Sequence, residues 1–471
     1  MAFYHFQPVL TSFLQHEGLP FADVLTEQTI QQAFDDAGVP NCQGDPDDSI
    51  IYTSALTMWA FLSQVLHQGV QRSCRASVAR VIVLCVALGR EPCSDDTGAY
   101  CRARARLPLP VIRHLTQQIA AGCERQVPES WLWRGLHVHL VDGTTVSTPD
   151  TESLQAEYPQ PTSQAEGVGF PLIRMVVILS LATAMIEDMA MGPYAGKETG
   201  ETALFRQLLG RMSSGDVVLA DRYFSSYFMI ALLQELGIHF VGRIHQRRAY
   251  DFRRGRRLGR QDHIVTWRRP VRPAWMDQAT YDRMPLTLQV REVGVQVNQP
   301  GFRVQALVVV TTLLDAERYT RDDLEELYHQ RWHVELDIRS IKISLSMDVL
   351  RCKTPEMVRK EIWTCLLAYN LIRQTMLQAA LLAGRSPRQL SFAAAMQKIA
   401  ASCGTILVIP EERALRLIDV HLWDLGTELV GDRPNRVEPR KIKRRPKPHE
   451  LLMEPRAEAR AGLLAGGALV E

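Results

Sequence analysis

Hydrophobic and polar positions follow a helical period in the first part of the chain and a strand period after it. Apolar residues recur at helical spacing in residues 53–71 and 72–88, which predicts a helical region over residues 1–130. From Leu136 the stretch LHVHLVD alternates apolar and polar residues, as a half-buried strand does, and it is predicted to end at Asp142. The pattern indicates a helical N-terminal region followed by a different kind of domain.

The segments after residue 142 alternate between strand and helix patterns. Counted with the strand before Asp142, their order is three strands, helix, strand, helix, strand, and the buried strand DVVLAD ends in Asp221. This order predicts an α/β core with a mixed sheet. The elements expected after the first strand are 171–181, 185–191, 199–212, 216–221, 225–236 and 239–244.

A stretch of roughly 60 residues interrupts this core, which is too long for a structureless loop. Strand patterns at 263–267 and 286–297 predict a β-rich insertion, and residues 303–312 return to the core as a strand. The predicted division of the chain is a helical region (1–130), an α/β domain (131–350) with its insertion (245–300), a second helical region (351–430) and a basic, partly extended tail (431–471).

The stretch YHQRWHVELDIRSIK, residues 328–342, has the spacing of a helix with two different faces. Tyr328, Arg331, Glu335 and Lys342 lie on one stripe, and Arg339 falls on it too. The other side is apolar and is predicted to pack on a core through Leu327, Val334, Ile338, Ile341 and Leu345. Thr320 followed by Asp323 is a plausible N-cap upstream.

Composition makes this an ordinary globular chain. Of its 471 residues 46% are hydrophobic and 23% are charged, and its apolar runs are too short to span a bilayer. No secretory signal pattern opens the chain, so a cytoplasmic protein without membrane contact is expected, bacterial and bound to the nucleoid when on DNA. The nine cysteines include no C-x-x-C pair, which favours reduced, packed thiols.

The net charge of +2 hides an uneven distribution. Residues 1–71 contain eight acidic residues and no Lys or Arg. Eleven Arg lie between Arg243 and Trp275 against two Asp, and a second run, 433–447, has eight Lys or Arg against one Glu. Basic clusters suit a polyanion such as DNA, although one such run alone is more often a solvated loop. The segment SDDTGAYCRARARL (94–107) is likewise either a DNA-facing or a solvated basic helix.

Three carboxylates are candidates for one metal site. Asp142 and Asp221 each end a predicted strand, where sites in α/β sheets are built, and Glu335 lies on the helix described above. Three carboxylates can hold two divalent cations, Mg²⁺ or Mn²⁺, for displacement at phosphorus. Each residue alone has a simpler explanation: a turn for Asp142, a helix cap for Asp221, and an ion pair with Arg331 or Arg339 for Glu335.

The pattern Y-x2-R-x3-E-x6-K, formed by Tyr328, Arg331, Glu335 and Lys342, resembles the signature of the insertion sequence 4 family of DDE transposases. The contexts LVDGTT and LADRYF resemble those of the family's first two acids, and 114 positions separate Asp221 from Glu335. The resemblance covers roughly residues 136–350 and implies a ribonuclease H-like catalytic core with a β-rich insertion before the third acid. It implies that Asp142, Asp221 and Glu335 are both the catalytic residues and the metal ligands.

The resemblance also implies how DNA is held. Tyr328, Arg331 and Lys342 would grip phosphates beside the metals. The other expected DNA contacts are Arg339, Trp332, Arg222, Arg253, Arg254, Arg256 and Arg257. Family members of this branch cut through a hairpin, in which a displaced base stacks on an aromatic ring, and Trp267, Trp275 and Trp332 remain equal candidates for that ring.

The sequence therefore favours a cut-and-paste DNA transposase that acts, at least as a dimer, on its element's terminal inverted repeats and on target DNA. A catalytically inactive or domesticated DNA-binding derivative remains an alternative. A tyrosine recombinase, with Tyr328 as the nucleophile, is less favoured because it leaves the three acids without a role.

Overall fold

The ribonuclease H-like order of strands is visible in the first half of the sheet. The computed structural model describes residues 27–41, 51–87, 89–296, 306–402, 405–406, 409–431 and 450–465. Three antiparallel strands come first, β1 (Val138–Ser147), β2 (Leu172–Ser180) and β3 (Ile186–Pro193). Two further strands, β4 (Val217–Ala220) and β5 (His239–Arg243), then run parallel to β1. The crossovers are α8 (Glu201–Arg206) and α9 (Tyr227–Glu235). The predicted α/β class is confirmed.

The expected end of β1 at Asp142 was wrong. Asp142 and Gly143 lie inside the strand, which stays paired with β2 as far as Ser147. Gly143 therefore does not form a turn. Of the two described strands that pair with β1, β4 stops pairing at Val141 while β2 continues.

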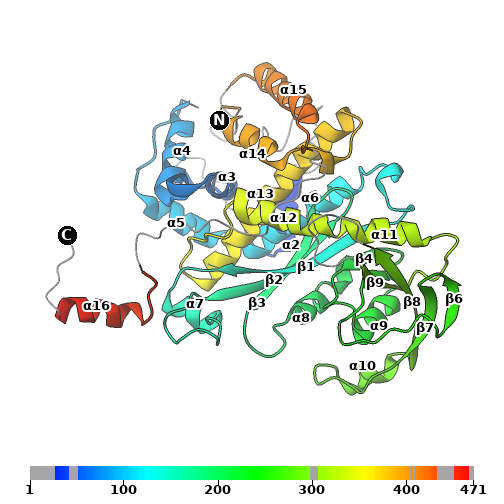
Figure 1. Ribbon diagram of the computed structural model, residues 1–471. Coiled ribbons are helices and arrows are strands. Elements are labelled where there is room, and N and C mark those ends of the chain that lie inside the picture. The colour runs from blue at the N-terminus through cyan, green and yellow to red at the C-terminus, as the bar shows by residue number, and fades with distance from the viewer. Residues whose placement is uncertain are drawn as a thin grey trace.

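The insertion extends the core sheet on its far side. β9 (Ala306–Thr311) pairs with β5, and β8 (Thr287–Gln296), β7 (Asp262–Arg268) and β6 (Arg256–Gly259) follow. The nine described strands lie in the order β3-β2-β1-β4-β5-β9-β8-β7-β6, with α10 (Gln278–Arg283) beside the insertion (Figure 1). The β-rich insertion is thus continuous with the catalytic sheet.

Helices cover both faces of the sheet. On one face lie α6 (Leu109–Glu124) and the long α13 (Pro355–Leu382), whose apolar side chains form one core with the strands. Asn370 of α13 accepts from the backbone N–H of Ile186 at 2.9 Å and donates to its carbonyl at 2.8 Å, which ties α13 to the edge strand β3. On the other face α8 and α9 form a second core around Phe205 and Phe224.

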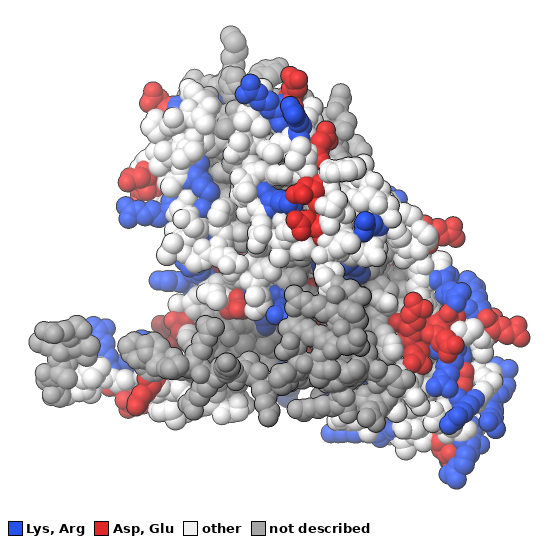
Figure 2. All heavy atoms as spheres, turned by 45° about the horizontal axis from the view of Figure 1, so that its top comes forward, with Lys and Arg blue, Asp and Glu red and all other residues white. Residues whose placement is uncertain are grey.

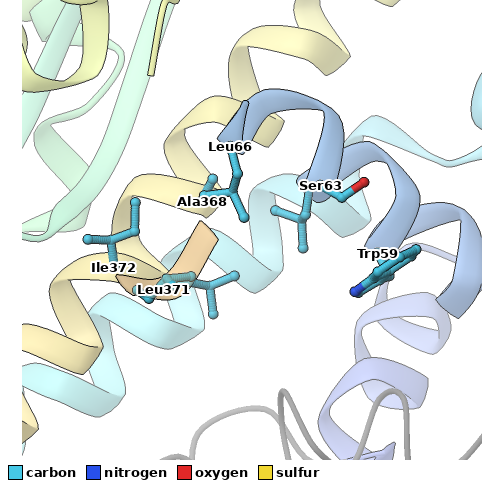
Figure 3. A pocket seen from close by; sticks show the side chains of 8 residues that line it. Trp59, Ser63, Leu66, Ala368, Leu371 and Ile372 are labelled. Carbon is cyan, nitrogen blue, oxygen red and sulfur yellow. The ribbon is translucent and has the colours of Figure 1, made fainter. Parts of the chain in front are cut away.

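The N-terminal helices contact the body through α13 and, in the case of α2, through α6. They are α2 (Glu27–Asp36), α3 (Ser54–Leu66), α4 (Cys74–Ala87) and α5 (Thr97–Arg106). Arg72 is buried and pairs with Glu361 of α13 at 3.1 Å. A small apolar pocket, lined by Trp59, Leu66, Leu371 and neighbouring side chains, lies where α3 meets α13 (Figure 3). Arg104 of α5 is buried on Gln64, so this part of the basic segment packs inward.

The segment that carries the Tyr/Arg/Glu/Lys stripe passes over β1 (Figure 1). It consists of α11 (Arg321–Gln330), α12 (Trp332–Arg339) and a π-helical turn, η5 (Ser340–Ser344). The five apolar positions expected to face the core are all buried, and Thr320 and Asp323 form the expected capping box. Hydrophobic periodicity thus predicted correctly which side of this segment is buried.

The remaining described elements lie at the ends of the chain and in connections. They are α7 (Glu152–Glu157), α14 (Phe392–Ser402), α15 (Glu411–Thr427), α16 (Arg456–Ala465) and the short 3-10 turns Gly69–Arg72, Glu129–Trp131, Leu209–Arg211 and Pro387–Gln389. The tail, expected to be partly extended, contains the helix α16. None of the helices in the described ranges has both the length and the apolar character needed to cross a bilayer.

Candidate functional site

Asp142 and Asp221 follow the last paired residues of two neighbouring parallel strands. Val141 of β1 lies beside Ala220 of β4, so each aspartate comes one position later on its strand. Neighbouring strands are about 4.8 Å apart, which brings the two carboxylates to one edge of the sheet. Beyond Val141, β1 continues without β4 beside it, so this side of β1 has no paired strand there.

Glu335 is carried to this edge by α12, which packs on β1. Arg331 connects the two elements: Nη2 lies 2.7 Å from Oε1 of Glu335, and Nη1 lies 3.8 Å from Oδ2 of Asp142. Lys342 donates to the carbonyl of Thr145 at 2.8 Å and to Oγ1 of Thr144 at 3.4 Å, further along β1. Arg331 and Lys342 therefore lie against the part of β1 that continues past the end of β4.

Burial raises the pKa of both aspartates. It raises the pKa of Asp142 to about 6; the N–H of Gly143 and the charge of Arg331 oppose the rise, and Asp221 and Glu201 add to it. Burial also raises the pKa of Asp221, against the N–H of Tyr223 and the charge of Arg331. Carboxylates that are partly buried near one another cost free energy unless a cation is beside them.

The donor set fits a hard divalent cation. Asp142, Asp221 and Glu335 all offer carboxylate oxygens, which are the ligands that Mg²⁺ and Mn²⁺ prefer. The charge of Arg331 already stands between Asp142 and Glu335, as a cation there would. Within the described ranges, no three His, Cys, Asp or Glu side chains converge into a metal-holding group. Metal binding would therefore require the Arg331 side chain to move away and the three carboxylates to come closer together.

Tyr328 and Arg339 differ in how accessible they are. Tyr328 is partly buried against the main core, and burial raises the pKa of its phenol. Arg339 is exposed at the end of α12. The charge of Arg243, the last residue of β5, acts on both Tyr328 and Asp221, which places it at the same edge. Arg243 was not among the DNA contacts predicted from the sequence, because nothing local marks it out from the other arginines of the basic run.

The three tryptophans proposed for base stacking lie in different surroundings. Trp267 is only 5% exposed, its indole N–H donates to Glu292 at 3.0 Å, and Arg248 covers its ring at 3.7 Å. Trp275 is partly buried against Phe228 and lies under Arg206. Trp332 is 39% exposed and adjoins Arg331. The surroundings favour Trp332 over Trp267 for contact with DNA.

Exposed arginines gather on the insertion. Arg253, Arg254, Arg256 and Arg257 are all exposed on or beside the edge strand β6, although Arg253 and Arg254 also pair with Asp251. Figure 2 shows the basic residues crowded along this end of the molecule, at the right. Arg222 is partly exposed directly after Asp221. The second basic run, 433–447, lies outside the described residues.

Two acids at or near the site were not identified from the sequence. Glu201, the first residue of α8, lies against Gly143, and its pKa is raised by burial and by Asp221. Asp337 is buried on the far side of α12 from Glu335 and accepts from Arg373 at 2.6 Å and from Arg388 at 2.9 Å. The pattern E-x-D in residues 335–337 was the only available signal for Asp337, and Glu201 had none beyond its position after a strand.

Comparison with known proteins gives a consistent result. A family described as "Transposase DDE domain" matches residues 133–371. The transposase InsG of insertion sequence element IS4, from Escherichia coli strain K12, is 28% identical over 312 residues, which cover 66% of each chain. The transposase of insertion sequence element IS421, from Escherichia coli, is 29% identical over 96 residues, or 20% of this chain and 26% of its own.

A solved structure of similar outline is a synaptic complex of piggyBac transposase with hairpin DNA. It has a TM-score of 0.41 and 11% identity, and the alignment covers 91% of this chain and 87% of that one. The chain spans about two thirds of the length of InsG and about a quarter of that of the IS421 transposase.

Proposed function

Since the chain belongs to the family of transposase DDE domains, we propose that it is a DNA transposase that moves an insertion sequence by cut-and-paste transposition. The observation that carries the proposal is the meeting of Asp142, Asp221 and the Arg331–Glu335 pair at one open edge of the sheet. Its substrates would be the terminal inverted repeats of its own element and, later, target DNA.

Membership of the family implies dependence on divalent metal ions. We propose that Asp142, Asp221 and Glu335 are the catalytic acids and would hold two Mg²⁺ or Mn²⁺ ions. Bound there, such ions would activate the attacking oxygen and stabilise the leaving one. No protein nucleophile is needed, because water breaks the first phosphodiester bond and frees a 3′-hydroxyl. That hydroxyl then attacks the opposite strand and forms a hairpin. Water opens the hairpin and frees the 3′-hydroxyl again. The freed hydroxyl then attacks target DNA.

The residues of the stripe would hold the strand being cut. Helical spacing would put Tyr328 and Arg339 on one stripe with Lys342, which reaches Thr145 of β1. Arg331, now paired with Glu335, would turn its guanidinium from the acids to a phosphate. Arg222, the four exposed arginines of the insertion and Arg243 would bind DNA further from the reacting phosphorus. Trp332 is the aromatic residue that we favour for stacking a displaced base.

We propose that the protein acts as a dimer on DNA, because two ends must be joined, and that it works in the bacterial cytoplasm on the nucleoid. The division into an N-terminal DNA-binding region, a catalytic domain, a second helical region and a basic tail remains part of this proposal. A tyrosine recombinase is not favoured, because the three acids would have no role in it.

The test is cleavage of a labelled DNA fragment that carries the terminal repeat of the element, with purified protein and Mg²⁺. Wild-type protein should cut at the repeat, and Ca²⁺ should permit binding with little cutting. Asp142→Asn, Asp221→Asn and Glu335→Gln should each abolish cleavage and keep binding, because each removes a metal ligand and little else. Glu326→Gln, an exposed acid on α11, is the control.

Two outcomes would count against the proposal. Near wild-type cleavage by one of the three variants would remove that residue from the site. Tight binding of the repeat by wild-type protein without any cleavage would favour the alternative, an inactive or domesticated DNA-binding derivative.

A further inference from the structure

A fourth carboxylate lies at the edge of the sheet that carries Asp142 and Asp221. Glu201 is the first residue of α8, which packs on the face of the sheet opposite to α12. A Cβ atom on Gly143 would lie 2.3 Å from Cδ and 2.4 Å from Oε1 of Glu201. The carboxyl of Glu201 therefore fills the space that a side chain at position 143 would need.

The open edge of β1 is where groups from both faces can meet. β4 pairs with β1 only as far as Val141, so no strand separates the two faces beyond that point on this side of β1. Asp142 and Gly143 point to opposite faces, as successive residues of a strand do. Asp142 thus approaches the edge from the side of α12, and Glu201 approaches it from the side of α8.

Burial and Asp221 raise the pKa of Glu201, and the charge of Arg174 opposes the rise without pairing with the carboxylate. In the part of the chain that the structure describes, no hydrogen bond or ion pair reaches its carboxylate. Arg174 donates instead to the carbonyl of Thr199 at 2.9 Å and stacks over Tyr194 at 4.4 Å. Glu198, three residues earlier, pairs with Arg206. A partly buried carboxylate beside two other acids is costly unless a cation joins it.

We propose that Glu201 is a fourth acidic ligand of the catalytic centre and would bind a divalent cation together with Asp142 and Asp221. The three carboxylates do not form a metal-holding group in the described part of the structure, so they would have to close around the ion. This inference rests on the proposed function, because it assumes that those two aspartates are metal ligands. It also gives a reason for glycine at position 143, since any side chain there would displace the carboxyl of Glu201. Two hard cations need many oxygen ligands, and a fourth carboxylate supplies up to two more.

A purely structural role for Glu201 makes a different prediction. As the first residue of a helix, Glu201 could simply favour the N-terminal end of α8. In that case its removal would lower the stability of the metal-free protein and leave the affinity for metal unchanged. Stability and metal affinity must therefore be measured separately, and neither measurement needs DNA or turnover.

The experiment is Mn²⁺ binding to the full chain, followed by electron paramagnetic resonance or titration calorimetry. Glu201→Gln should weaken Mn²⁺ binding by roughly tenfold or more, with thermal unfolding of the metal-free protein nearly unchanged. Gly143→Ala should weaken it similarly, because its methyl group pushes Glu201 aside while both aspartates remain. Glu198→Gln is the matched control and should bind Mn²⁺ as wild-type protein does.

A second measurement uses the unmodified protein. Fe²⁺ with ascorbate and peroxide should cut the backbone near residue 201 as well as near 142 and 221, because the radicals form at the bound metal. Absence of cutting near 201 would overturn the inference, and so would wild-type Mn²⁺ affinity in Glu201→Gln when Asp142→Asn has lost it. If neither Asp142→Asn nor Asp221→Asn altered Mn²⁺ binding, the metal site of the proposed function would itself be wrong.

Discussion

Arg331 and Asp142, 189 positions apart in the chain, approach each other to 3.8 Å between Nη1 and Oδ2. The same guanidinium donates to Glu335 at 2.7 Å, so one internal cation neutralises two of the proposed metal ligands. Arginine is always charged, and its fork suits carboxylates and phosphates equally. When the catalytic complex assembles, metal ions could therefore replace Arg331 beside the two acids, and a DNA phosphate could replace the acids beside Arg331.

The first prediction concerns this competition. Arg331→Ala should raise the Mn²⁺ affinity of the DNA-free protein by about tenfold, because it removes a positive charge next to the ligands. The same variant should cleave DNA poorly, because no guanidinium then holds the DNA phosphate. Mn²⁺ titration and a cleavage assay measure the two effects. Arg339→Ala, an exposed arginine of the same helix, should leave the Mn²⁺ affinity unchanged, and weaker Mn²⁺ binding by Arg331→Ala would contradict the competition.

The second prediction concerns how α12 is held. Asp337 is buried and accepts from Arg373 of α13 and from Arg388 of the Pro387–Gln389 turn. Asp337→Ala would leave two arginine charges without their partner, which should cost about 3–5 kcal/mol of unfolding free energy. Denaturant unfolding would measure it, with Asp348→Ala, an exposed residue nearby, as the control. A loss below about 1 kcal/mol would mean that the contacts of Asp337 with the two arginines do not anchor the helix.

Most of the fold could be predicted from the sequence because its signals are local. Alternation of apolar residues marked the strands, and helical spacing in residues 328–342 identified the buried side of that segment. The placement of Asp221 at the end of its strand followed from the same patterns. The stop at Asp142 was wrong because Asp-Gly usually forms a turn, whereas here β2 keeps its hydrogen bonds with the strand as far as Ser147.

What depends on contacts between distant segments could not be predicted in this way. Glu201 meets Gly143 only because α8 returns to the edge of β1. Trp267 looked as available as Trp332, but pairing of β7 with β8 places its indole on Glu292. The position of the basic insertion at the end of the core sheet also depends on a long-range pairing, that of β9 with β5.

The third prediction concerns pH and stability. His139 lies between Glu187 and Asp216 at the other end of β1. Burial alone would lower its pKa, but the two acids outweigh burial and raise the pKa to about 10, above its usual 6.5. The stabilisation from charged His139 is complete below pH 6.5 and is lost as the pH rises towards 10, at up to about 1.4 kcal/mol per pH unit.

Unfolding midpoints between pH 6.5 and 10 would measure this decline in stability. His139→Gln, which cannot carry the charge, should be less stable at pH 6.5 and should show a flatter decline than wild-type protein. His245→Gln, in the loop after β5, is the control and should follow the wild-type curve. Equal pH slopes for wild-type protein and His139→Gln would mean that the histidine is neutral.

The fourth prediction concerns the basic insertion. Replacing Arg253, Arg254, Arg256 and Arg257 by glutamine should weaken DNA binding and reduce its salt dependence, by about 0.9 in slope for each phosphate that the variant no longer neutralises. Binding isotherms at several salt concentrations would measure the slope. Arg413→Gln with Arg416→Gln removes two exposed charges on α15, away from the sheet, and should change the slope less per charge. An unchanged slope in the fourfold variant would mean that the four arginines are solvated and do not contact DNA.

The last prediction separates a phosphate contact by Tyr328 from covalent catalysis. Tyr328→Phe keeps the ring that packs on the core and removes one hydrogen bond, worth about 0.5–1.5 kcal/mol, or up to about 3 kcal/mol with a charged partner. Cleavage should therefore fall and survive, whereas Glu335→Gln should be nearly inactive because a metal ligand is no longer charged. Denaturing gels of both reactions give the answer, because a covalent intermediate would appear as DNA bonded to protein. Such an adduct in the wild-type reaction, together with no cleavage by Tyr328→Phe, would overturn the metal-dependent mechanism, since the phenol would then be the nucleophile.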